Sequence, residues 1–170
     1  MKLLNLHWKN LSFDKFRNEV LKDYRVVCES REASLLGRKE VLTGKAKFGI
    51  FGDGKEVAQV AMAKFFKEGD FRAGYYRDQT FMFAAGLSTI EQFFSQLYSD
   101  PDLNHDPFSA GRQMNSHFAT KFVDENGEWL DLANKKMFQQ ILHQLPVKCQ
   151  EHWGWHLHQN YSGRKRPLRS

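Results

Sequence analysis

The sequence contains little cysteine, little proline and no long apolar run. Two cysteines and four prolines occur in 170 residues. Two cysteines cannot build the disulfide framework of a small secreted domain, and the first ten residues lack the apolar core and cleavage site of a secretory signal. No apolar run approaches the roughly 18 residues of a membrane-spanning helix. We therefore expect a cytoplasmic protein of one domain's length, without a membrane partner.

The excess positive charge is concentrated near the C-terminus. The chain has 25 Lys and Arg against 20 Asp and Glu. Residues 137–170 hold five of the basic and one of the acidic residues, so that 20 basic and 19 acidic residues remain in 1–136, a net charge of +1. A nearly neutral body gives little support to a surface that follows a phosphate backbone, and we do not expect nucleic acid as a partner.

Apolar residues at three- and four-residue spacing predict a long helical segment that starts near Ser12 or Asp14 and ends at Gly44. This is the pattern of a helix with one apolar face. The apolar stripe consists of Phe16, Val20, Tyr24, Val27, Cys28, Leu35 and Leu36. Because the stretch at 30–34 is polar, either one long helix or two abutting helices fit the pattern.

Three shorter helices and one strand are predicted further along the chain. The helices are expected at 56–66, ending near the C-cap glycine Gly69, and at 81–87 and 90–99. Ser88 and Glu91 form a predicted capping box for the last of them. The aromatic stretch at 71–78 reads as a strand or extended loop.

The remaining segments read as connections. A glycine-rich loop is predicted at 45–56, and a long loop with two prolines at 99–117. A loop as long as the one at 99–117 is usually functional or mobile. A further strand is predicted at 118–122 and a turn at 124–129.

Gly52-Asp53-Gly54 invites comparison with the metal motif of thiamine-diphosphate enzymes, in which an Asp and a later Asn hold a divalent ion. The next Asn after Asp53 is Asn104, far beyond the separation that such a motif uses. A glycine turn that leads into the helix near Glu56 explains the motif better. We expect no metal ligands here.

Tyr76 and Arg77 form the strongest candidate binding pair. An Arg at the end of a short strand, followed by a turn and a helix, can offer its planar fork to a phosphate, and a tyrosine can stack or donate its hydroxyl. On residue chemistry alone, a salt bridge from Arg77 to Asp78 or Asp70 is the commoner role.

Histidines supply two further candidates. His117 is predicted on an exposed loop, where it could act as acid, base or oxyanion partner, although a lone loop histidine is more often incidental. In the tail, Cys149, His152 and His156 have a spacing that zinc ligands can have. With one cysteine and no helix or strand pattern around them, we interpret these three as accidental neighbours.

Four segments in order resemble the alpha subunit of the decarboxylating component of 2-oxoacid dehydrogenase complexes, over about residues 28–136. The segments are SREASLLGRKE, FGDGKEVAQVAMA, FRAGYYRDQTFMFAAG and AGRQMNSHF. GRQM followed closely by His117 is more similar to the branched-chain type than to the pyruvate type.

The resemblance implies roles for three residues. Tyr76 and Arg77 match the pair that contacts the thiamine diphosphate pyrophosphate, and His117 matches the loop histidine near the reactive carbon and the substrate carboxylate. It also implies an α/β fold in which this chain is the N-terminal, mainly helical and truncated portion of an open parallel-sheet domain. Magnesium, a beta subunit or fused beta half, and a lipoyl acyltransferase are implied partners of the intact protein. The family's metal motif lies beyond the end of this sequence.

The likeness stops at Lys136, and residues 137–170 differ in character. They hold four of the seven His and two of the four Trp. Residues 137–161 can be back-translated so that reading from the third base gives VSADITPTAGQMPRALGLAFASKL, a segment of the kind expected there. One additional A in the run encoding Lys135 and Lys136 restores that frame. We interpret 1–136 as dehydrogenase and 137–170 as an out-of-frame, disordered tail.

The sequence is compatible with two functions. The first is a fragment of a 2-oxoacid dehydrogenase, inactive alone, with apolar surface on the helix faces at 57–66 and 90–97 exposed because the sheet that would cover them is missing. The alternative is a non-enzymatic binding module whose basic tail touches nucleic acid in a salt-dependent way.

The frame interpretation makes a direct prediction about the gene. Resequencing the A run at codons 135–137, with continued reading past the stop codon, should reveal a missing base and thiamine-enzyme coding downstream. An intact run followed by no such coding in any frame contradicts it.

Overall fold

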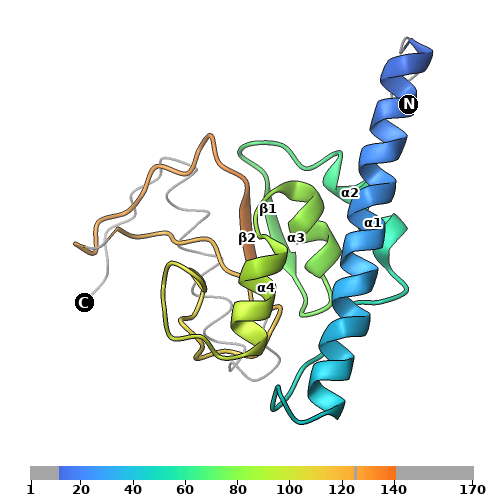
Figure 1. Ribbon diagram of the computed structural model, residues 1–170. Helices are drawn as coiled ribbons and strands as arrows, with labels where there is room; N and C mark the ends of the chain where they lie inside the picture. The colour runs from blue at the N-terminus through green and yellow to red at the C-terminus, as the bar shows by residue number, and fades with distance from the viewer. Residues whose placement is uncertain (1–11, 125, 141–170) are drawn as a thin grey trace. The chain divides into compact units, whose positions relative to one another are not determined.

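The structure, a computed structural model, describes residues 12–124 and 126–140, which belong to one compact unit (Figure 1). Its elements are the helices α1 (Phe13–Leu42), α2 (Glu56–Ala63), α3 (Gln79–Ala85) and α4 (Ile90–Leu97), and the strands β1 (Phe71–Gly74) and β2 (Met137–Gln140). This mixed α/β composition agrees with the predicted class. Among the described helices, none combines the length and apolar character needed to cross a bilayer.

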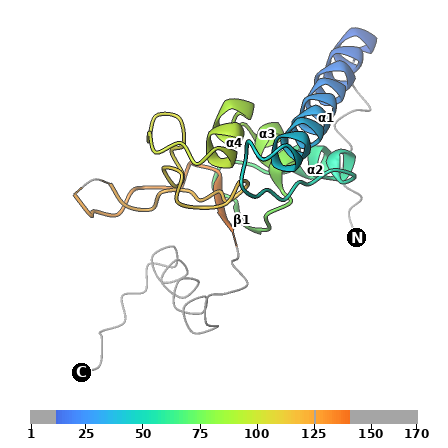
Figure 2. The same ribbon diagram turned by 60° about the horizontal axis from the view of Figure 1, so that its bottom comes forward.

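α1 is one continuous helix of 30 residues, which decides between the two possibilities that the sequence left open. At 1.5 Å per residue it is about 45 Å long. Ser12 is its N-cap, as predicted, although the Ser12 side chain makes no capping hydrogen bond. In Figures 1 and 2 the N-terminal turns of α1 extend past the neighbouring helices.

The apolar stripe of α1 is not its buried face. Phe16, Val20 and Tyr24 are about half exposed or more. The buried residues of α1 are mostly small or polar, namely Ser30, Ala33, Ser34, Gly37 and Glu40. Small side chains let α2 and α3 approach the C-terminal half of α1 closely, and that contact, rather than hydropathy, selects the buried face.

A buried amide connects α1 with α3. The Gln79 side chain, fully buried, donates to the carbonyl oxygen of Ser30 at 3.2 Å and to Oγ of Ser34 at 2.8 Å. Next to it, the hydroxyls of Ser30 and Thr80 lie 2.6 Å apart. Each buried polar group in this contact therefore has a hydrogen-bond partner. Its burial thus avoids the free-energy cost of an unpaired donor or acceptor.

The ends of the short helices differ slightly from the predicted ones. α2 ends at Ala63, earlier than predicted, and Gly69 belongs to the following turn. α3 ends at Ala85, and Gly86 is its left-handed C-cap. The predicted capping box of α4 is displaced by one residue, because Thr89 and Gln92 form it instead of Ser88 and Glu91.

The two strands are parallel, with Arg72 of β1 opposite Phe138 of β2. The predicted strand at 118–122 is wrong, since only an isolated bridge joins Ala119 to Gln139. The turn near 124–129 is confirmed, because the Asp124 carboxylate accepts from the amides of Asn126 and Glu128. β2 starts at Met137, the first residue of the predicted tail, and the rest of that tail from 141 lies outside the described residues.

The core is aromatic and lies between the sheet and the helices α3 and α4. Its fully buried large apolar side chains are Phe81, Phe93, Phe118, Phe138, Met82 and Met137. Phe93 and Leu97 bury the apolar face of α4, so the predicted exposure of that face is wrong. On α2 the prediction holds in part, because Val57 is 73% exposed while Val60 is buried.

Replacement of Gln79 by Ala should lower the free energy of unfolding by about 3 kcal/mol, since buried serine hydroxyl and amide partners would lose their hydrogen bonds. Chemical denaturation followed by circular dichroism measures it. Gln113→Ala, at an exposed glutamine, is the matched control and should stay within about 0.5 kcal/mol. Equal effects of the two substitutions would contradict the role given to Gln79.

Candidate functional site

The turn between β1 and α3 holds Tyr76 and Arg77 in a fixed backbone. The amide of Asp78 donates to the Tyr75 carbonyl at 3.0 Å, and the amide of Tyr75 donates to Oδ2 of Asp78 at 3.1 Å. Gln59 of α2 donates from Nε2 to the Arg77 carbonyl at 2.8 Å. The turn is therefore closed on itself and anchored to α2.

The Arg77 side chain is exposed, and among the described residues it forms no ion pair. The salt bridge to Asp78 that residue chemistry favours is made by Arg72 instead, at 2.7 Å. The Asp70 carboxylate accepts from the amide of Lys67. Because its carboxylate neighbours are already engaged, the Arg77 guanidinium is available to an anion from outside.

The tyrosines beside Arg77 form an aromatic surface. The rings of Tyr75 and Tyr76 have centroids 3.8 Å apart, and the Arg77 guanidinium carbon lies 5.4 Å from the Tyr76 ring centroid. A hydrogen bond with Tyr76 raises the pKa of Tyr75. Stacking on Tyr76 orients the guanidinium plane without consuming its hydrogen-bond donors.

His117 is buried, which corrects the predicted exposed position: 8% of its surface is accessible. The loop before it is folded around the buried Asp106, whose carboxylate accepts from the amides of Ser109 and Gly111 at 3.2 and 2.9 Å. Asp106 thus organises the middle of the long loop, while Gln96 of α4 bonds to the backbone of His117 at its end.

The segment that contains Ile50 and Gly52 lies between the two halves of the candidate site. Asn115, two residues before His117, accepts from the Ile50 amide at 3.1 Å and donates to the Ile50 carbonyl at 2.8 Å. The Gly52 amide donates to Oε1 of Gln79 at 3.1 Å. One short stretch of backbone therefore contacts both the histidine loop and the residue that starts α3.

Gly52 also passes directly over the arginine turn. A Cβ at this position would lie 2.4 Å from the Arg77 carbonyl oxygen, which only a residue without a side chain avoids. The sequence drew attention to Gly52 as part of a turn, but not to this contact. Asn115 and Gln79 gave no recognisable signal at all, since each acts on residues distant in the chain.

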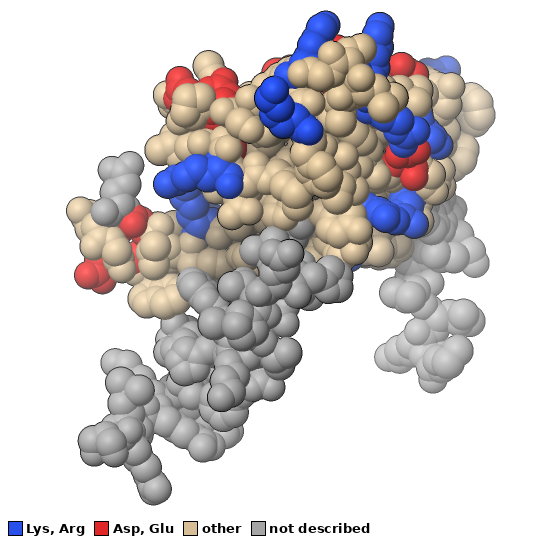
Figure 3. Space-filling view, turned by 90° about the horizontal axis from the view of Figure 1, so that it is seen from below, with Lys and Arg blue, Asp and Glu red and all other residues tan. Residues whose placement is uncertain are grey.

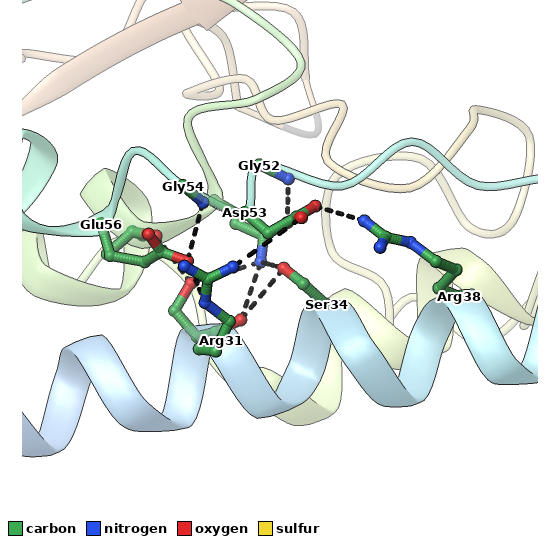
Figure 4. A network of polar contacts seen from close by, with 10 residues as sticks. Arg31, Ser34, Arg38, Gly52, Asp53, Gly54 and Glu56 are labelled. Carbon is green, nitrogen blue, oxygen red and sulfur yellow. Dashed lines mark hydrogen bonds and ion pairs between the residues drawn. The ribbon is translucent and has the colours of Figure 1, made fainter.

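A charged network fixes the turn at Asp53 (Figure 4). The carboxylate of Asp53 pairs with Arg38 at 2.6 Å and lies 3.8 Å from Arg31, which also pairs with Glu56 at 3.0 Å. The hydrogen bond from Arg38 lowers the pKa of Asp53. Gly54 has φ +89, so the predicted glycine turn is confirmed and Asp53 serves as an ion-pair partner within it.

In the part of the chain that the structure describes, the candidate residues Tyr76, Arg77 and His117 belong neither to a cluster of metal ligands nor to the lining of the two cavities described below. Within residues 12–124 and 126–140, no three His, Cys, Asp or Glu side chains gather as metal ligands. Cys149, His152 and His156 lie outside the described residues. Two cavities, of about 350 and 450 Å³, lie beside Phe108 and Phe66, and their linings contain none of the three candidate residues. The candidate site therefore combines an exposed arginine turn with a buried histidine.

The basic side chains on one face of the described surface are dispersed. In Figure 3, Lys and Arg lie as separate groups around uncharged surface, instead of forming one stripe. Elsewhere in the described residues, and independently of this view, Arg31, Arg38 and Lys64 form ion pairs with carboxylates. This face therefore has no arrangement that would follow a phosphate backbone.

Comparison with known proteins gives one match. Residues 26–132, more than half of the chain, match the family described as the dehydrogenase E1 component. No curated protein and no solved structure matches the chain. The matched range includes Arg77, His117 and the segment between them.

The close approach of Gly52 to Arg77 predicts a costly substitution. Gly52→Ala should lower the free energy of unfolding by about 3 kcal/mol, because the new Cβ overlaps backbone that cannot move aside. Thermal or chemical denaturation measures it. In Gly44→Ala, the control, φ is +76 but nothing lies within 4 Å of the added Cβ, and the cost should be about 1 kcal/mol. Similar losses in both variants would argue against the contact.

Proposed function

The chain belongs to the dehydrogenase E1 component family, whose members depend on thiamine diphosphate, and from this premise we propose that its Tyr76–Arg77 turn is a diphosphate-binding element. The whole protein would be the alpha subunit, or the alpha half of a fused chain, of a 2-oxoacid dehydrogenase. It would catalyse oxidative decarboxylation and pass the acyl group to lipoamide on a partner acyltransferase.

The single observation that supports this proposal most is the exposed Arg77 guanidinium, which forms no ion pair with any residue that the structure describes and lies on a hydrogen-bonded turn. A diphosphate presents several oxygens to one planar donor fork, and a bidentate contact is strongest when the fork is already oriented. Arg72 neutralises Asp78 at 2.7 Å, so the carboxylate nearest in sequence does not compete for Arg77. The residues present therefore fit the charge and shape of a diphosphate.

The cofactor and these side chains would have different roles in the reaction. When bound, thiamine diphosphate supplies the carbon nucleophile that attacks the 2-oxo group. Arg77 would neutralise diphosphate charge, Tyr76 would orient the Arg77 plane, and His117 would accept or hold a hydrogen bond near the substrate carboxylate. His117 is buried, and a hydrogen bond made in such surroundings is stronger than one made in water.

The finer assignments belong to the same proposal. The run Gly111–Met114 followed by His117 favours a branched-chain 2-oxoacid substrate over pyruvate. Magnesium would be held by the motif expected beyond this sequence, and a beta subunit or fused beta half would complete the site. The 170-residue chain alone is therefore expected to be inactive.

Calorimetry with thiamine diphosphate and magnesium tests the proposal on two proteins. The 170-residue chain should give no micromolar binding. The frame-restored full-length chain, with its beta half, should bind, and Arg77→Ala in that protein should weaken binding 10- to 100-fold, which is the loss of about 1.5 to 3 kcal/mol expected for a charge-assisted contact.

Arg25→Ala provides the matched control, since Arg25 is exposed on α1 and, within the described part of the chain, forms its ion pair with Glu29. Its affinity for the cofactor should equal that of the unmodified protein. Micromolar binding of thiamine diphosphate by the 170-residue chain would contradict our expectation that this chain does not bind the cofactor. Equal affinity of the Arg77 and Arg25 variants would refute the role of the turn.

A further inference from the structure

Two buried amide side chains hold the His117 loop from opposite ends. Gln96 of α4 donates from Nε2 to the His117 carbonyl at 2.7 Å and accepts from the His117 amide at 3.2 Å. Asn115 makes the same pair of bonds with the backbone of Ile50, at 3.1 and 2.8 Å. Gln96 and Asn115 are 1% and 2% exposed, so water does not compete for these bonds.

The residue between the two amide pairs has an unusual backbone. Ser116 has φ +62, in the left-handed region that a residue with a side chain seldom adopts, and it is fully buried. Such a conformation persists only where its surroundings over-determine it. Here the bonds made by Asn115 and Gln96 on either side supply that constraint.

The constrained backbone gives the His117 ring a defined partner. Nδ1 of His117 lies 3.3 Å from the Asn115 carbonyl oxygen. A carbonyl oxygen can only accept a hydrogen bond, so Nδ1 carries the proton whenever this bond is made. In the neutral ring the free electron pair is then on Nε2.

We propose that Asn115 is a positioning residue that fixes His117 as the Nδ1–H tautomer and leaves Nε2 as its accepting atom. Its side chain orients the 115–116 peptide by its hydrogen bonds to the backbone of Ile50, and the carbonyl of the same residue accepts the hydrogen bond from the ring Nδ1–H. The role of Nε2 toward a substrate rests on the proposed function, whereas the tautomer is a property of the 170-residue chain itself.

Nitrogen-15 NMR of the histidine-labelled 170-residue chain tests the tautomer. The spectrum is taken above pH 8.5, where an ordinary imidazole is neutral, and the His117 signals are those lost in His117→Gln. We expect a protonated Nδ1 and an unprotonated Nε2, the reverse of the preference of free histidine. Protonation on Nε2 in the unmodified chain would overturn the proposal.

Variants test the part played by Asn115. Asn115→Ala should move the tautomer ratio toward Nε2–H by up to about fivefold, as expected for the loss of one ordinary hydrogen bond. Asn115→Asp keeps the acceptor for the Ile50 amide but loses the donor, and should shift the ratio less. Asn104→Ala is the control, since Asn104 is exposed and bonded to Asp102, and should leave the ratio unchanged.

Only variants whose helical circular dichroism equals that of the unmodified chain are compared, so that an unfolded variant is recognised. If Asn115→Ala does not fold, Asn115→Asp replaces it. An unchanged ratio in a folded Asn115 variant would overturn the positioning role. If the frame-restored protein does not bind thiamine diphosphate while the tautomer is as expected, the proposed function fails and the assignment of Asn115 stands.

Discussion

The buried amide of Gln79 is the interaction on which both halves of the candidate site depend. It donates to Ser30 and Ser34 on α1 and accepts from the Gly52 amide, while its own backbone starts α3 directly after the arginine turn. Because these bonds are buried, each would cost more to lose than a surface bond would. Gln79 therefore helps to set the position of Arg77 relative to the 50–52 segment, together with the Gln59 bond to the Arg77 carbonyl and the contact of Gly52 with that carbonyl.

The sequence predicted the positions of the elements well, because their signals are local. Glycines, prolines and helix periodicity located α1 to α4 and β1, and the aromatic run before Arg77 indicated a strand end. The face that α1 buries could not be predicted in the same way. It depends on Ser34 being small enough for α3 to approach and on Gly37 leaving room for the Phe51 ring, whereas hydropathy alone favours Phe16 and Val20.

The sequence allowed us to predict which residues form the candidate site. It did not allow us to predict their burial or their hydrogen-bond partners. Tyr76 and Arg77 follow from a local motif, whereas the burial of His117 requires Gln96 and Asn115, whose partners lie 21 and 65 positions away. The bonds to the Asp106 carboxylate are local, since its partners Ser109 and Gly111 lie three and five positions away, but the composition of this proline-containing loop predicted only a functional or mobile segment. Contacts between distant segments leave no periodic trace in a sequence.

Strand β2 is compatible with the frame interpretation because position 138 is apolar in both reading frames. In this chain Phe138 is fully buried opposite Arg72, and its ring occupies the space beside Gly74 where a Cβ would collide. In the restored frame the same position encodes valine, a smaller β-branched residue suited to a buried parallel strand. A chain that has lost its frame one codon earlier can therefore still pair β1 for a few residues. The arginine turn and the histidine loop keep their own hydrogen bonds in that case, because Gln59, Gln79, Gln96 and Asn115 all precede the break.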